Sequence, residues 1–198
     1  MADSLFEDIL SMLGQKGVQE VARSAGTDPK QTEAATGAAV SALLKGLAHN
    51  AEEKSAAEQM IEALRRDHSR FDPRQVEVET RRVDPEDATK ILRHIFGERQ
   101  DKVERQLGRA TGVGPDGMAK ILKTLAPIVM GMLANRGQER KVETGPDLSR
   151  WLGQEQRQLQ EKKKDLGFLE MILDRDHDGD VDIGDMAGWM GKILGGSR

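Results

Sequence analysis

Apolar residues recur at helical spacing from the start of this 198-residue chain. The first face of this kind has apolar residues at positions i, i+4, i+7 and i+8, namely Leu5, Ile9, Met12 and Leu13. Gly14 is predicted to end this helix, and a second helix is predicted to end at Gly26. Aromatic residues make up 3% of the chain and tyrosine is absent, so a core has to be built from aliphatic residues. That set favours packed helices over sheets, and the predicted fold class is all-α.

The boundaries of the next helices are also marked. Asp28 suits a helix N-cap and Pro29 suits the first helical position, so a third helix is predicted from here to Ala48. Another amphipathic helix is predicted over residues 52–66. The helical pattern then fails until Pro85, and residues 76–83 alternate briefly like a strand. We expect a loop there.

A weak internal repeat has an offset of 86 residues. The matching residues lie at predicted helix ends, where glycine and proline mark helix boundaries. Arg23, Gly26 and Pro29 correspond to Arg109, Gly112 and Pro115. The repeat predicts two similar helical hairpins that pack on each other. Pro127 lies inside the long helix of the second hairpin and is expected to kink or split it.

Three helical stretches and an acidic tail together resemble a known family. The stretches are VARSAGTDP at 21–29, ILRHIFGERQDKV at 91–103 and ATGVGPDGMAKILKTLAPIVMGML at 110–133, and the tail is DRDHDGDVDIGD at 174–185. The chain resembles the YidB-like bacterial proteins of unknown function (domain of unknown function 937) over roughly residues 5–135. The resemblance implies a homeodomain-like helical fold and brings no activity with it.

The domain organisation follows from these patterns. We expect a helical repeat domain at 1–136, a linker and polar helix at 137–165, and a calcium-binding segment at 166–198. Within the polar helix, leucine recurs every seven residues, but Glu155 and Lys162 occupy the positions where a coiled-coil seam needs apolar side chains. One helix that lies along its own domain is therefore favoured over a self-pairing coiled coil.

Residues 174–185 predict a calcium-binding loop of the EF-hand or dockerin type. Such a loop supplies oxygen ligands from positions 1, 3, 5, 7, 9 and 12, which are here Asp174, Asp176, Asp178, Asp180, Asp182 and Asp185. Gly179 stands at position 6, where the chain turns sharply, and Val181 at the apolar position 8. Asp185 is shorter than the usual glutamate, so magnesium becomes a competitor for calcium.

A fainter copy of the loop lies at residues 64–70. Arg65 and Ser69 replace ligands there, and Arg70 replaces the turn glycine. We expect this copy to bind no metal.

Catalysis is not expected. The chain contains no cysteine, and His49, His68, His94 and His177 are scattered without the spacing of a metal site. His94 precedes the apolar Ile95 and is predicted to be a partly buried structural residue. No nucleophile, acid and base converge in the pattern, so neither an enzyme nor a small-molecule substrate is expected.

The predicted function is a calcium-binding, non-enzymatic interaction or structural protein, with a protein partner or self-association. A helix-turn-helix-like nucleic-acid-binding protein is the alternative, because residues 21–35 form a helix, a glycine turn and a second helix. That second helix offers few side chains to bases, and the net charge of −4 makes nucleic acid an improbable main ligand, although a local basic patch is compatible with it. No signal sequence or apolar run of membrane length is evident, which predicts a cytoplasmic protein without membrane contact.

Overall fold

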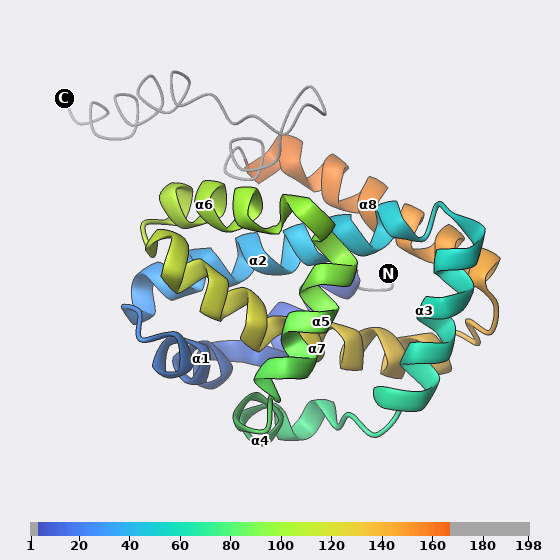
Figure 1. Ribbon diagram of the computed structural model, residues 1–198, viewed down its shortest axis with the longest axis horizontal. Helices are drawn as coiled ribbons and strands as arrows, with labels where there is room; N and C mark the ends of the chain where they lie inside the picture. The colour runs from blue at the N-terminus through green and yellow to red at the C-terminus, as the bar shows by residue number, and fades with distance from the viewer. Residues whose placement is uncertain (1–3, 167–198) are drawn as a thin grey trace.

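The computed structural model describes residues 4–166, and every regular element within them is a helix (Figure 1). The α-helices are α1 (Leu5–Ala25), α2 (Pro29–Asn50), α3 (Lys54–Asp67), α4 (Val76–Arg81), α5 (Pro85–Phe96), α6 (Gln100–Thr111), α7 (Gly114–Glu139) and α8 (Gly145–Leu166). Two short 3₁₀ helices are η1 (Pro73–Gln75) and η2 (Gly97–Arg99). The all-α prediction is confirmed for this part of the chain.

The predicted break at Gly14 is present within α1. This glycine has φ 50° and ψ −166°, so two helical segments meet there at a kink. Gly26 then ends α1 in the left-handed conformation at φ 70°, and its N–H donates to the carbonyl of Ala22. Glycine takes positive φ without the steric cost that a side chain brings, which is why both boundaries could be predicted from sequence.

Side-chain caps fix the starts of the next helices. The Asp28 carboxylate accepts hydrogen bonds from the backbone N–H groups of Lys30 and Gln31, and Pro29 is in the first turn of α2, as predicted. Asp84 and Pro85 repeat this arrangement at α5. Each cap satisfies N–H groups that have no partner within the helix.

Helix α7 is the central element of the described chain. It contacts α1, α2, α3, α4, α5 and α6, and its buried side chains face several of them. By length and composition α7 could cross a membrane, but 72% of its most apolar window is buried inside the helical body. Pro127 was predicted to kink or split this helix. It lies inside the continuous helix α7, so the predicted split is wrong.

The region between α3 and α5 is helical where a loop was expected. Asp72 caps η1, and α4 follows directly over residues 76–81. Val76 and Thr80, four residues apart, are both buried, and the Thr80 hydroxyl donates to the Val76 carbonyl at 2.7 Å. The alternation of polar and apolar residues suggested a strand, but the buried pair has helical spacing.

Helix α8 lies along the helical body and contacts α2 and α3 (Figure 1). Leu148, Trp151, Leu152 and Leu159 are buried and belong to the same core as the apolar residues of α1 to α7. The prediction of one helix packed along its own domain is thus confirmed for the described part of α8. The connection between α7 and α8 is short, because α7 continues to Glu139 and α8 begins at Gly145.

Candidate functional site

The six predicted calcium ligands lie outside the described residues. They are Asp174, Asp176, Asp178, Asp180, Asp182 and Asp185, whereas the description ends at residue 166. Their arrangement therefore stays a prediction. Helix α8 is the described element nearest to the loop in sequence, and polar contacts fix α8 to the helical body.

The degenerate copy at residues 64–70 forms the end of α3 and the turn after it. The Arg66 guanidinium donates two hydrogen bonds of 2.8 Å to the Asp67 carboxylate, and Arg65 donates to the Glu143 carbonyl at 2.7 Å. Arg66 holds the pKa of Asp67 below its ordinary value. Among the described side chains, which end at residue 160, no three His, Asp or Glu residues form a group that could hold a metal ion.

Two histidines that are far apart in sequence share one open cavity of about 640 Å³. His49 and His94 line it together with Asn50, whose side-chain N–H₂ donates to the carbonyls of His94 and Ile95. His94 is exposed, so the prediction of a partly buried structural residue is wrong. The adjacent Ile95 and Phe96 are the side chains that turn into the core, because they lie on the other face of α5.

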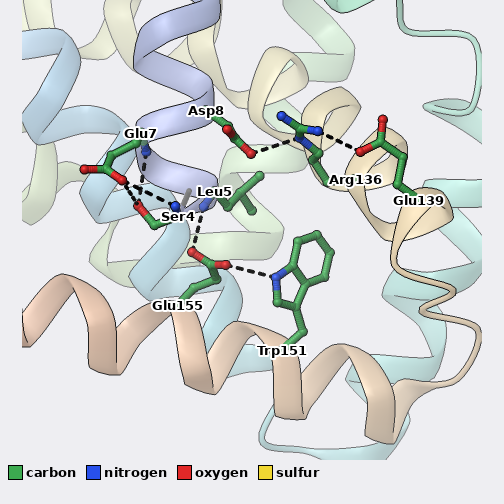
Figure 2. A network of polar contacts seen from close by, with 8 residues as sticks. All are labelled: Ser4, Leu5, Glu7, Asp8, Arg136, Glu139, Trp151 and Glu155. Atoms are coloured by element: carbon green, nitrogen blue, oxygen red, sulfur yellow. Dashed lines mark hydrogen bonds and ion pairs between the residues drawn. The ribbon is translucent and has the colours of Figure 1, made fainter. Parts of the chain in front are cut away.

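A buried carboxylate on α8 joins the two ends of the described chain (Figure 2). Glu155 is buried, with only 3% of its surface exposed. Its Oε2 atom accepts a hydrogen bond of 2.7 Å from the backbone N–H of Leu5, and its Oε1 atom accepts one of 3.0 Å from the indole N–H of Trp151. Both carboxylate oxygens are thus engaged by donors that are themselves buried.

Glu155 acts as a second cap at the start of α1. Ser4 and Glu7 form a capping box, in which the Ser4 hydroxyl accepts from the Glu7 N–H and the Glu7 carboxylate accepts from the Ser4 N–H. Leu5 is the first helical residue, and its N–H has no partner within α1. The negative charge of Glu155 also lies where the helix dipole favours an anion. Helix α8 is therefore fixed to the N-terminus of α1 by a specific polar contact.

Arg136, near the end of α7, adds ion pairs on the same side of the molecule (Figure 2). Its Nε lies 2.9 Å from Asp8 Oδ2, and its Nη1 lies 2.7 Å from Glu139 Oε2. The hydrogen bond that Arg136 donates to the Glu139 carboxylate and the negative charge of Asp8 raise the pKa of Arg136. The Arg140 guanidinium lies 5.4 Å from the centre of the Trp151 ring, within the range of a cation–π contact.

Sequence reasoning missed the role of Glu155. It treated this residue as a polar side chain at a coiled-coil seam position, whereas in the structure it is buried and accepts hydrogen bonds from Trp151 and Leu5. One local signal was available, because Trp151 precedes Glu155 by four residues and so lies on the same helix face. The other partner lies 150 residues away and left no local signal.

Comparison with known families assigns most of this helical body. The model of a bacterial protein family of unknown function, DUF937, matches residues 7–136. The chain belongs to the DUF937 family. No curated protein and no solved structure matches the chain. The DUF937 match agrees closely with the range over which the sequence resembled YidB-like proteins, and it does not extend to the acidic tail.

The end of the DUF937 match coincides with the end of the packed core of α7. Arg136, the last matched residue, forms the ion pair with Asp8, which is near the first matched residue. Helix α8 lies beyond the match and reaches back through Glu155 to Leu5. The polar network of Figure 2 therefore connects the DUF937 helices to the helix that precedes the acidic tail.

Proposed function

We propose that this DUF937 protein is a calcium-binding, non-enzymatic interaction protein. Its helical body would carry an EF-hand-like segment at residues 166–198, with ligands supplied by Asp174, Asp176, Asp178, Asp180, Asp182 and Asp185. The observation that carries the proposal is the pattern of this loop, in which the acidic positions coincide with the turn glycine Gly179 and the apolar Val181. Calcium is the proposed ion, with magnesium as its competitor.

The docking of α8 supports the proposal, because it fixes the helix that precedes such a segment in the sequence. Glu155 and the buried Trp151 hold α8 on the DUF937 helices at a point 19 residues before Asp174. A loop attached to a fixed helix can transmit metal binding to a surface of the body or to a partner protein. A protein partner or self-association is accordingly part of the proposal, as is a cytoplasmic location.

The proposed fold includes two similar hairpins, α1–α2 and α6–α7. Gly26 and Gly112 both adopt left-handed conformations at the ends of α1 and α6, and they are 86 residues apart. Pro29 and Pro115 then lie in the first turns of α2 and α7. The hairpins also contact each other through α1, α2 and α7. Common geometry at the same offset supports a repeat.

The alternative, nucleic-acid binding through α2, has less support from the packing. From Ala38 to Leu44, every residue of α2 is buried, which leaves little of the helix free to enter a groove. Lys30 and Gln31 are exposed at its N-terminal end, but the Gln31 side chain lies against the turn at Gly112. The burial of residues 38–44 thus favours packing over base reading as the role of α2.

The proposal predicts one calcium ion per chain. Calorimetric titration of the full chain should give a stoichiometry of one, and Asp174→Ala combined with Asp185→Ala should abolish binding, because both ends of the ligand set are removed. Repeating the titration with saturating magnesium measures how far that ion competes.

Asp67→Ala is the matched control, because it removes a carboxylate from the degenerate copy at residues 64–70. Calcium binding should be unchanged in this variant. A second site that disappears in Asp67→Ala, or wild-type binding by the double variant, would contradict the assignment of the ligands.

A further inference from the structure

A groove between α1, α4, α5 and α7 is lined mainly by positively charged side chains, although the protein as a whole has a negative net charge. It consists of two adjoining cavities of about 400 and 450 Å³, which share Pro85 and Lys123 in their walls. Helices α1, α4 and α7 and the start of α5 line the first cavity, and α5 and α7 line the second. Lys123 of α7 thus stands where the two cavities meet, and we call the pair the basic groove.

Cationic side chains dominate the basic groove. Its walls hold six of them, Arg23, Arg81, Lys90, Arg93, Lys120 and Lys123, against two carboxylates, Glu20 and Glu86. The protein as a whole has a net charge of −4. A groove lined by one sign of charge concentrates the electrostatic field and attracts ligands of the opposite sign.

One carboxylate of the groove is already neutralised. Glu20 is nearly buried and pairs with Arg23 at 2.6 Å and with Arg81 at 2.8 Å. The two guanidinium groups hold the pKa of Glu20 below its ordinary value. Glu20 therefore positions both arginines at one end of the groove while leaving their outer N–H groups exposed to solvent.

The other four cations have no carboxylate partner within the described residues. No ion pair involves Lys90 or Arg93 of α5, or Lys120 or Lys123 of α7. On each helix the two cations are three residues apart and so share one face. Like charges held together in this way repel one another, and a bound anion would relieve that repulsion.

The remaining walls of the groove favour phosphate groups over bases. Ser24, Thr80 and Thr124 also line the first cavity. The Thr80 and Thr124 hydroxyls donate to the carbonyls of Val76 and Lys120, and the Ser24 hydroxyl lies 3.2 Å from that of Thr124. No aromatic side chain of the described chain lines either cavity, so the stacking that usually holds single-stranded bases is missing from the groove. The guanidinium and ammonium groups of the groove are donors of the kind that bind phosphate oxygens.

We propose that the basic groove binds a linear polyphosphate, a ligand with several phosphate groups in a row. Arg23 and Arg81 engage one end of the chain, Lys120 and Lys123 its middle, and Lys90 and Arg93 its other end. This site is on the DUF937 helices and does not depend on the predicted calcium loop.

Calorimetric titration of the full chain with sodium tripolyphosphate, in calcium-free buffer, tests the proposal. We expect saturable binding that weakens with added salt, and a loss of affinity of at least about tenfold in Lys123→Glu, because this change reverses the charge shared by both cavities. Lys30→Glu is the matched control, because Lys30 is an exposed lysine on α2 outside the groove. It makes the same change in net charge and should bind as the wild type.

Lys90→Ala combined with Arg93→Ala tests the same groove with exposed residues if Lys123→Glu fails to fold, and it should also weaken binding. The proposal is overturned if tripolyphosphate does not bind, if folded groove variants bind as the wild type, or if Lys30→Glu loses as much affinity as Lys123→Glu. Tighter binding of a DNA duplex, with no binding of tripolyphosphate, would likewise overturn it in favour of a nucleic-acid surface.

Discussion

Replacing Glu155 by alanine is expected to lower the free energy of unfolding by about 2–5 kcal/mol. The substitution leaves two buried donors, the Leu5 N–H and the Trp151 indole N–H, without an acceptor. Each unsatisfied buried group costs roughly 1–3 kcal/mol. The Glu155→Ala substitution also leaves a cavity beneath α8. Urea unfolding followed by circular dichroism measures the change.

Glu139→Ala is the matched control for this prediction, because it removes a carboxylate of the same network from an exposed position. The Glu139 side chain is 55% exposed, so its ion pair with Arg136 is expected to contribute less than about 1 kcal/mol. Glu155→Gln keeps one acceptor oxygen and should fall between the two. Equal stability of Glu155→Ala and Glu139→Ala would mean that the buried carboxylate does not fix α8 to α1.

Gly108→Ala is expected to destabilise the protein by about 1–3 kcal/mol through overpacking. Gly108 is buried in α6, where the backbone of the α6–α7 turn passes directly over it. An added Cβ would lie 2.5 Å from the carbonyl carbon of Gly114 and 2.7 Å from the backbone nitrogen of Pro115. Because these are backbone atoms, no side-chain rotation can relieve the contact. Thermal and urea unfolding both report the loss.

Gly37→Ala offers a control that should change stability in the opposite direction. Gly37 is also inside a helix, α2, but a Cβ there would meet no atom within 4 Å. Alanine is a better helix former than glycine, so a gain of about 0.5–1 kcal/mol is expected. A loss of stability in both variants would show that close backbone contact is not the reason Gly108 matters.

Features encoded by a few neighbouring residues were predictable from the sequence. Asp28 and Pro29 cap and begin α2, and Gly14 and Gly26 break and end α1, because each residue acts on backbone groups within four positions of itself. The all-α class followed from aliphatic residues at helical spacing. The DUF937 relationship was also visible in short stretches around these helix ends.

Features that depend on distant partners were not predictable in this way. Glu155 is polar in sequence and buried in the structure because its donors come from α1 and from Trp151. The basic groove likewise combines residues of four helices, so no stretch of sequence contains it.

Helix α4 was missed for a different reason. Only two of its side chains, Val76 and Thr80, are buried, which is too few to show a clear helical period in the sequence.

Hydrogen exchange of the full chain with and without calcium tests the central claim most directly. The account predicts slower amide exchange at residues 174–194 when calcium is present, and unchanged exchange over α1 to α7, because a ligand stabilises the state that binds it. Asp174→Ala combined with Asp185→Ala should remove the difference. Equal exchange of residues 174–194 in both conditions would contradict the claim that calcium acts on this segment.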